Sequence, residues 1–177
     1  SPLSGNNGTN MILRHASGDR SRLPGSRPSR RLACALAIAG WAAEWWRWVL
    51  AIPADRNPLL DTNGRHAHEG QSGPVFYLAG TTSTDVPMVR SCVVPCGKAL
   101  FFPLVNSVNW APGDCSPVSP IDCKIKSNSY VDQVTHIECE VDGIPICNVG
   151  DYREETDYFG ITLPPDNIAG LPSELRP

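Results

Sequence analysis

The residues best suited to chemistry are two histidines in the segment His66-Ala67-His68-Glu69. In a β-strand alternate side chains face the same way, so His66 and His68 would point together, as metal ligands of a jelly roll do. His136 is the third histidine in the body of the chain. These three side chains predict the metal site of a cupin-like enzyme. Glu69 lies next to His68 and would point away from both histidines, so a solvated loop is the alternative interpretation.

A second set of candidates consists of the carboxylates Asp61, Glu138 and Glu140. Glu138 and Glu140 are two residues apart, so a strand would place both on one face, where paired carboxylates can hydrolyse a glycosidic bond. The alternative for these two is ordinary surface charge. Asp61 lies between a proline-containing and a glycine-containing segment, which is equally typical of a structural Asx-turn.

Three aromatic residues are candidates for stacking against sugar rings, namely Trp46, Tyr77 and Trp110. Trp41, Trp45 and Trp48 recur with helical spacing and predict one apolar stripe on a helix over residues 35–51. Trp46 lies beside this stripe and widens it. The alternative to a sugar platform is therefore that these rings pack against a sheet.

Composition and charge exclude several function classes. The net charge of -3 gives no field that favours nucleic acid, so we expect no nucleic-acid partner. No glycine-rich dinucleotide or phosphate fingerprint occurs, and we expect no cofactor. Residues 1–31 are rich in Gly, Ser, Pro, Asn and Arg, which indicates a disordered or leader segment.

An apolar run, LACALAIA at residues 32–39, follows an arginine pair and resembles the core of an export signal. The run is too short to span a bilayer, so we expect no integral membrane segment. A helix preceded by a loop is the alternative interpretation. Six of the seven cysteines lie in the body of the chain, at Cys92, Cys96, Cys115, Cys123, Cys139 and Cys147. An even number behind a leader predicts up to three disulfides and a secreted, periplasmic or extracellular location.

The pattern of short apolar runs predicts a single β-rich domain over residues 32–177. Strands are expected at residues 74–79, 88–94, 99–105 and 158–163, with a long loop at 110–128. The fold class predicted is mainly β, an antiparallel β-sandwich or jelly roll with one N-terminal helix.

A hairpin over residues 134–148 is the most specific structural prediction. Asp142-Gly143 is a two-residue turn in which both positions take positive φ. This turn places Val141 opposite Ile144 and Cys139 opposite Ile146. Cys139 and Cys147 then point to opposite faces and are not expected to form a disulfide.

Four dense motifs carry a resemblance to a family of uncharacterised secreted proteins, mostly bacterial. The family pattern is similar to WWxWxxxIP, NPxxDxxG, GQxGPVxFLAG and VPxGKAxxFPxxN. The corresponding segments here are residues 45–53, 57–64, 70–80 and 94–106, followed by the hairpin and by DNIAGLP at residues 166–172. The resemblance implies no established activity. It implies that relatives continue with further strands, so we expect a C-terminally truncated fold with an exposed sheet edge.

The hypothesis that follows is a secreted β-sandwich that acts as a binding or structural module, with surface polysaccharide as its ligand. Another copy of the chain, pairing through the exposed sheet edge, is the second partner expected. An extracellular hydrolase of the glycoside type and a cupin-like metal enzyme are the alternatives.

Overall fold

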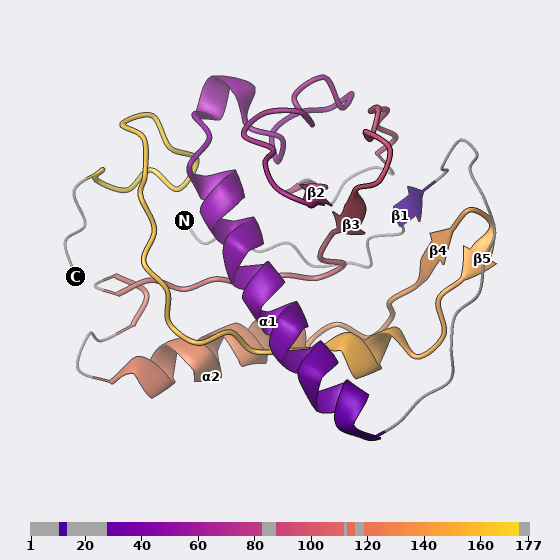
Figure 1. The fold of residues 1–177 in the computed structure, drawn as a ribbon. Coiled ribbons are helices and arrows are strands. Elements are labelled where there is room, and N and C mark those ends of the chain that lie inside the picture. The colour runs from indigo at the N-terminus through magenta and orange to yellow at the C-terminus, as the bar shows by residue number, and fades with distance from the viewer. Residues whose placement is uncertain (1–10, 14–27, 83–87, 112, 116–118, 174–177) are drawn as a thin grey trace.

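The computed structural model describes residues 11–13, 28–82, 88–111, 113–115 and 119–173 (Figure 1). Helices and short strands in these segments alternate with long irregular stretches. The strands are β1 (Met11–Leu13), β2 (Val75–Tyr77), β3 (Ala99–Phe101), β4 (Cys139–Val141) and β5 (Ile144–Pro145). The helices are α1 (Pro28–Leu50) and α2 (Pro120–Val131), with 3-10 turns η1 (Ala54–Arg56) and η2 (Val149–Tyr152).

The prediction of an antiparallel β-sandwich or jelly roll is wrong. The described strands are two or three residues long and form two small sheets, ordered β1-β4-β5 and β2-β3. The β2–β3 and β1–β4 pairs are parallel, and β4–β5 is antiparallel. Residues 88–94 and 158–163, both predicted as strands, are irregular.

A side chain, and not a further strand, closes the outer edge of β2. The Gln71 amide donates to the carbonyl of Tyr77 (2.8 Å) and accepts from its N–H (3.0 Å), which reproduces the pairing of a neighbouring strand. The same amide donates to the carbonyl of Ala67 (2.9 Å). On this edge of β2, a glutamine side chain thus satisfies the backbone groups of Tyr77 that a neighbouring strand would otherwise pair.

Helix α1 is the central element of the core. It begins at Pro28, earlier than predicted, and residues 28–31 of the proposed leader are thus helical. Most of the rest of residues 1–31 lies outside the described residues. Trp45, Val49 and Leu50 are almost fully buried, at 2%, 0% and 2% exposure. Within the described segments, neither helix combines the length and the hydropathy that a bilayer crossing requires.

The tryptophans of α1 tie the helix to the rest of the fold through their indole N–H groups. Trp45 donates to the carbonyl of Leu78 (2.9 Å), just beyond β2, and Trp48 donates to that of Glu69 (2.8 Å). The Trp48 ring also stacks on Tyr77, with centroids 5.4 Å apart. Because each buried indole N–H has a specific acceptor, these hydrogen bonds fix how α1 lies against β2 and its flanking loops, while the rings bury apolar surface.

The predicted hairpin register is confirmed. Val141 pairs with Ile144, and the N–H of Ile146 donates to the carbonyl of Cys139 (2.8 Å). Asp142 and Gly143 have φ of 54° and 78°, as a type I′ turn requires. Cys139 and Cys147 are both free. The apolar face of the hairpin is only partly covered, however, because Ile144 is 64% exposed.

Helix α2 occupies residues that were predicted as a long loop. Ser119 precedes Pro120 at the first helical turn, and Asp122 follows within that turn, which favours a helix start. A disulfide joins Cys115 to Cys123 across this start, with Cα atoms 5.3 Å apart. The described residues thus contain one disulfide, where up to three were expected. The free cysteines among them are Cys92, Cys96, Cys139 and Cys147.

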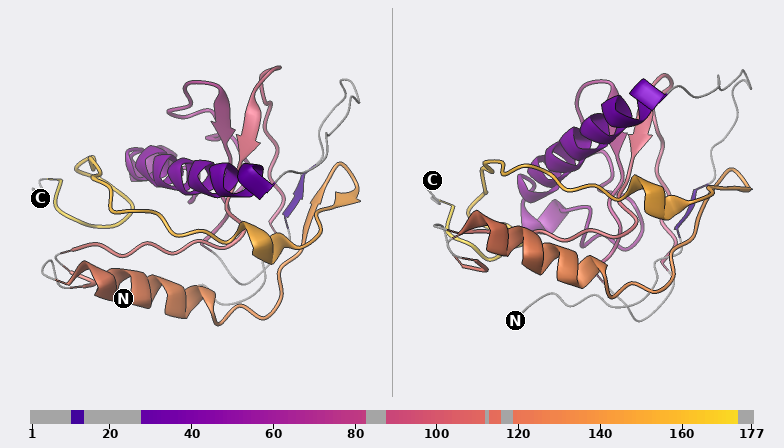
Figure 2. Two further views of the ribbon diagram at one scale, coloured as in Figure 1. Left: turned by 60° about the horizontal axis from the view of Figure 1, so that its bottom comes forward. Right: turned by 90° about the horizontal axis from the view of Figure 1, so that it is seen from below.

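The C-terminal segment at residues 158–163 runs between α1 and α2 (Figure 2). Arg47 of α1 donates to the carbonyl of Gly160 (3.2 Å) and lies over the Phe159 ring. Lys124 of α2 lies over the Tyr158 ring on the other side. Leu163 then enters the core, at 5% exposure. The two helices are therefore held together through this segment.

Candidate functional site

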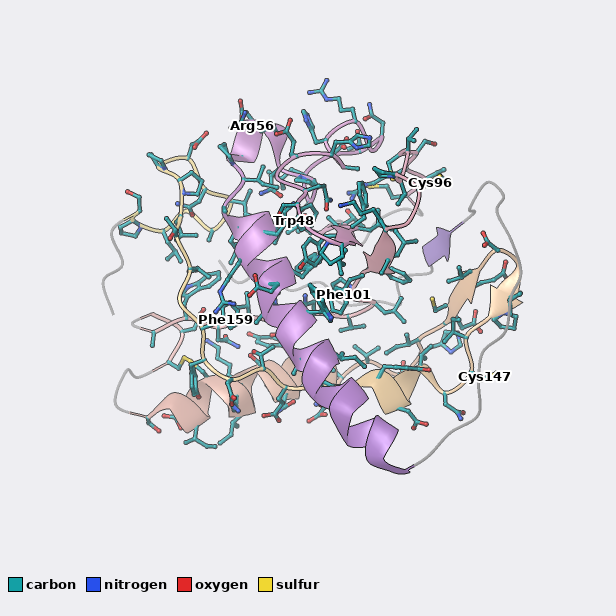
Figure 3. All side chains as sticks on the ribbon, in the orientation of Figure 1. Trp48, Arg56, Cys96, Phe101, Cys147 and Phe159 are labelled. Carbon is teal, nitrogen blue, oxygen red and sulfur yellow. A yellow bond between two sulfur atoms is a disulfide. The ribbon has the colours of Figure 1, made fainter. Side chains whose placement is uncertain are left out.

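The candidate site is the loop that follows α1, at residues 54–66. A shallow, open depression of about 280 Å³ lies there. Its polar lining comes from Asp55, Asp61, Thr62, Asn63, Arg65 and His66. The volume is close to the lower limit of about 300 Å³ for small-molecule sites. Arg56, labelled in Figure 3, marks this end of the molecule.

Asn57 anchors the loop to the end of α1. Its side-chain amide donates to the carbonyl of Val49 (2.7 Å) in the last turn of α1, which also accepts from the N–H of Ile52 (3.4 Å), and to the carbonyl of Ile52 (2.9 Å) just beyond the helix. Its Oδ1 accepts from the N–H of Leu59 (3.0 Å). At 1% exposure, this side chain is fully inside the protein and fixes where the loop begins.

Asp61 shapes the second half of the loop. Its carboxylate accepts from the backbone N–H groups of Asn63 (3.0 Å) and His66 (2.8 Å), and that of Gly64 also contributes. Burial of Asp61 acts to raise its pKa, but these hydrogen bonds and the nearby His66 ring outweigh burial and hold the pKa below its ordinary value. The carboxylate oxygens of Asp61 thus accept hydrogen bonds from the backbone of its own loop, which agrees with the Asx-turn interpretation.

A second segment, which contains Arg90, contacts this loop. The Arg90 guanidinium donates through Nη1 to the carbonyls of Pro58 (3.0 Å), Ala79 (3.0 Å) and Gly80 (2.6 Å). Burial lowers the pKa of Arg90, while the charge of Asp61 acts in the opposite direction. Arg90 therefore joins the loop after α1 to the loop after β2.

Gly64 packs directly against that segment. It has φ of 92°, and a Cβ there would lie 2.3 Å from the Ser91 carbonyl oxygen. The N–H of Ser91 in turn donates to the carbonyl of Asn63 (3.0 Å). The backbone between Asn63 and Arg65, two residues that line the depression, is thus held by contacts that only glycine permits.

The histidines that were predicted as metal ligands lie in different surroundings. His66 accepts at Nε2 from Arg65 Nε (2.8 Å), whereas the His68 ring contacts the edge of Phe76 at 5.7 Å. His136 is exposed, and its Nε2 lies 3.1 Å from Glu138 Oε1. Within the described part of the chain, no three His, Cys, Asp or Glu side chains are grouped as metal ligands would be.

The carboxylates proposed for a hydrolase are also separated. Glu138 and Glu140 belong to the hairpin, which lies away from the loop that holds Asp61 (Figure 1). Glu138 is exposed, and Glu140 is half-buried. Of the candidates for catalysis and metal binding, the structure brings Asp61 and His66 together at the depression, and His136 and Glu138 together on the exposed surface near the hairpin.

The aromatic candidates are divided between the core and the periphery. Trp46 and Tyr77 belong to one cluster of rings, joined through Trp45 and Trp48. Tyr77 is only 8% exposed, and Trp46 is half-buried and donates to Asn106 Oδ1 (3.0 Å). Trp110 is half-buried, and no described ring contact joins it to this cluster.

Sequence reasoning missed Asn57, Arg65 and Arg90 as parts of this site. One signal was present for Asn57, because an asparagine that follows a helix-ending proline can satisfy the helix carbonyls. No local pattern announces Arg90, since its acceptors come from residues 58, 79 and 80.

The polar residues of the dense motifs thus hold the backbone in place. In the described residues, every buried side-chain nitrogen or oxygen has a hydrogen-bond partner. No family model, no curated protein and no solved structure matches the chain. The depression at residues 54–66 is therefore characterised by its own geometry: a fixed backbone, a polar lining and an open mouth.

Proposed function

We propose that this chain is a non-catalytic binding module that acts outside the cytosol and holds a hydroxylated ligand of the saccharide class in the depression at residues 54–66. The observation that carries the proposal is the preformed polar lining. Asp61 and Asn57 fix the loop from within, which leaves Asp55, Thr62, Asn63 and Arg65 at its surface.

The chemistry of this lining supports a ligand with many hydroxyl groups. A carboxylate, an amide, a hydroxyl and a guanidinium offer both donors and acceptors within one small site. Leu60 is 51% exposed and lines the same depression, so it offers an apolar surface to the C–H face of a sugar ring. A fixed loop also loses little conformational freedom on binding, which favours affinity.

Asp61 supports binding over catalysis. A general acid must carry a proton near neutral pH, but the pKa of Asp61 is lowered. As a carboxylate, it already accepts hydrogen bonds from the backbone of its own loop. Its role here is to shape the depression, and the same hydrogen bonds would oppose its use as a nucleophile.

The disulfide supports a location outside the cytosol. Cys115 and Cys123 close a short loop at the start of α2, and such bonds persist where the environment is oxidising. The leader-like run at residues 32–39 agrees with export. The same disulfide in protein recovered from the secreted fraction, shown by peptide mapping without reductant, would support this location.

The direct test is an NMR titration of the His66 ring. The chain has four histidines, so labelled imidazole spectra are simple to assign with a His66→Gln variant. Maltotriose, galactotriose and trigalacturonate serve as probes. We expect at least one of them to shift His66 and the amides of residues 61–66 while the exposed His136 stays unchanged.

Two outcomes would overturn the proposal. No shift at His66 with any probe at millimolar concentration would exclude the depression as a saccharide site. A change in tryptophan fluorescence without a His66 shift would place the ligand on Trp46 or Trp110 instead. Thr62→Val, which removes one lining hydroxyl from an exposed residue, is expected to weaken binding without changing the thermal midpoint.

A further inference from the structure

The Arg65 guanidinium is oriented by the protein but not neutralised by it. Its Nε donates to His66 Nε2 (2.8 Å), and its backbone N–H donates to Asn63 Oδ1 (3.1 Å). Among the described residues, no carboxylate lies within 4.0 Å of this guanidinium, whereas Arg47, Arg56 and Arg153 each have one. Both Nη groups of Arg65 thus remain as donors at the wall of the depression.

The acidic residues of the depression differ in what they offer a ligand. Asp61 is 7% exposed, and its oxygens accept hydrogen bonds from the backbone inside the loop. Asp55 is exposed and belongs to η1, away from the Arg65 turn along the chain. The depression therefore has a donor wall at Arg65 and an acceptor at Asp55.

We propose that the ligand is an acidic saccharide, whose carboxylate is bound by the two Nη groups of Arg65 and whose ring hydroxyls donate to Asp55. A guanidinium forms two parallel hydrogen bonds with a carboxylate, a geometry that a hydroxyl group cannot reproduce. Because Nε is already occupied by His66, the fork faces the ligand through its Nη edge. This inference rests on the proposed function and names the ligand class of the same site.

The expected selectivity is modest because the site is open to water. An exposed ion pair contributes less than about 1 kcal/mol, which corresponds to about fivefold in affinity, and bidentate geometry adds to it. We therefore expect trigalacturonate to bind about fivefold to tenfold more tightly than galactotriose, its neutral counterpart. This preference should shrink between 50 and 500 mM salt, because the Debye screening length falls from about 14 Å to about 4 Å over this range.

The test compares the two trisaccharides on the full chain and on three variants, by His66 ring shifts and by calorimetry. Arg65→Gln removes the charge and should abolish the preference for trigalacturonate, so that the two trisaccharides bind this variant with the same affinity. Arg65→Lys keeps the charge but loses the fork, so an intermediate preference is expected. Arg56→Gln is the matched control, because Arg56 is exposed on the same loop and is already paired with Glu69 at 3.9 Å.

The possible outcomes separate this inference from the proposed function. Equal binding of both trisaccharides, or a preference that survives Arg65→Gln, would overturn the role of Arg65 and leave a saccharide site in place. Loss of the preference in Arg56→Gln would show that the ligand carboxylate binds Arg56 and not Arg65, which would also overturn the role of Arg65. No binding of either trisaccharide would overturn both proposals. Thermal midpoints within about 2 °C of the parent protein show that the variants are folded.

Discussion

Replacement of Asn57 by alanine should be among the most destabilising single changes in this protein. The side chain is 1% exposed and makes three hydrogen bonds: to the carbonyl of Val49 in α1, to the carbonyl of Ile52 just beyond it, and from the N–H of Leu59. Asn57→Ala would remove the side-chain partner of the Ile52 carbonyl and of the Leu59 N–H, and would leave the Val49 carbonyl with the N–H of Ile52 (3.4 Å) alone.

The magnitude follows from the two groups that lose their side-chain partner. A buried donor or acceptor that loses its partner costs about 1–3 kcal/mol, so two of them predict a loss of about 2–5 kcal/mol after partial relaxation. Small proteins are stable by about 5–15 kcal/mol in total. The variant should therefore unfold at a much lower urea concentration and be partly unfolded at 37 °C.

The assay is urea unfolding followed by tryptophan fluorescence, since the core tryptophans report directly on α1. The midpoint should fall while the slope with denaturant stays constant, because the surface exposed on unfolding is nearly unchanged. Asn106→Ala is the matched control. Asn106 is exposed and accepts one hydrogen bond, from Trp46 Nε1, so its loss should cost less than about 1 kcal/mol.

Asn57→Asp separates hydrogen bonding from lost volume. Aspartate has nearly the same shape, but it would place a buried carboxylate against the carbonyls of Val49 and Ile52. Burial and repulsion would raise its folded-state pKa, so the variant should be least stable at neutral pH and recover as pH falls and the carboxyl group is protonated. A single net hydrogen bond contributes about 1 kcal/mol. If the unfolding free energies of Asn57→Ala and Asn57→Asp both stay within about 1 kcal/mol of the parent at pH 7, the role given to Asn57 is refuted.

Three further predictions concern the loop and the disulfide. The folded-state pKa of Asp61 is lowered, so its ionised form contributes stability at pH values above its unfolded-state pKa near 3.8. The difference in unfolding free energy between the parent and Asp61→Asn should therefore shrink as pH falls through the folded-state pKa. Urea unfolding at stepwise pH measures this difference. Gly64→Ala should cost about 2–3 kcal/mol, because it combines positive φ with a close carbonyl, whereas Gly73→Ala has positive φ alone and should cost about 1 kcal/mol; equal midpoints would contradict this. Reduction of the Cys115–Cys123 disulfide, which spans 8 residues, should lower stability by about 2–3 kcal/mol, and an unchanged thermal midpoint in reductant would exclude that contribution.

Local patterns predicted the elements whose stability is local. The hairpin register followed from Asp142-Gly143, because this turn leaves one pairing between the two strands. The helical stripe of Trp41, Trp45 and Trp48 followed from spacing alone, and it packs against β2 as its apolar face requires. In each case the residues that define the element are neighbours along the chain.

The start of α2 could also have been found locally. Ser119, Pro120 and Asp122 form a helix-start pattern, but the surrounding serines and prolines favoured a loop. The segment 158–163 misled in the opposite way. Its apolar residues predicted a strand, but the neighbouring rings of Tyr158 and Phe159 pack against side chains of α2 and α1. The segment therefore lies between two helices and pairs with no described strand.

The sequence by itself determined the main helix, the hairpin and the presence of dense, non-repeating motifs. Only the tertiary structure decided what those motifs do. Gln71 and Arg90 each bond backbone groups that come from other turns or segments. Such bonds depend on which carbonyls are left unpaired once the chain has folded, and no periodicity records that. The same physical reason explains why a sandwich was expected: apolar runs indicate burial, but they do not say whether a strand or a side chain satisfies the backbone.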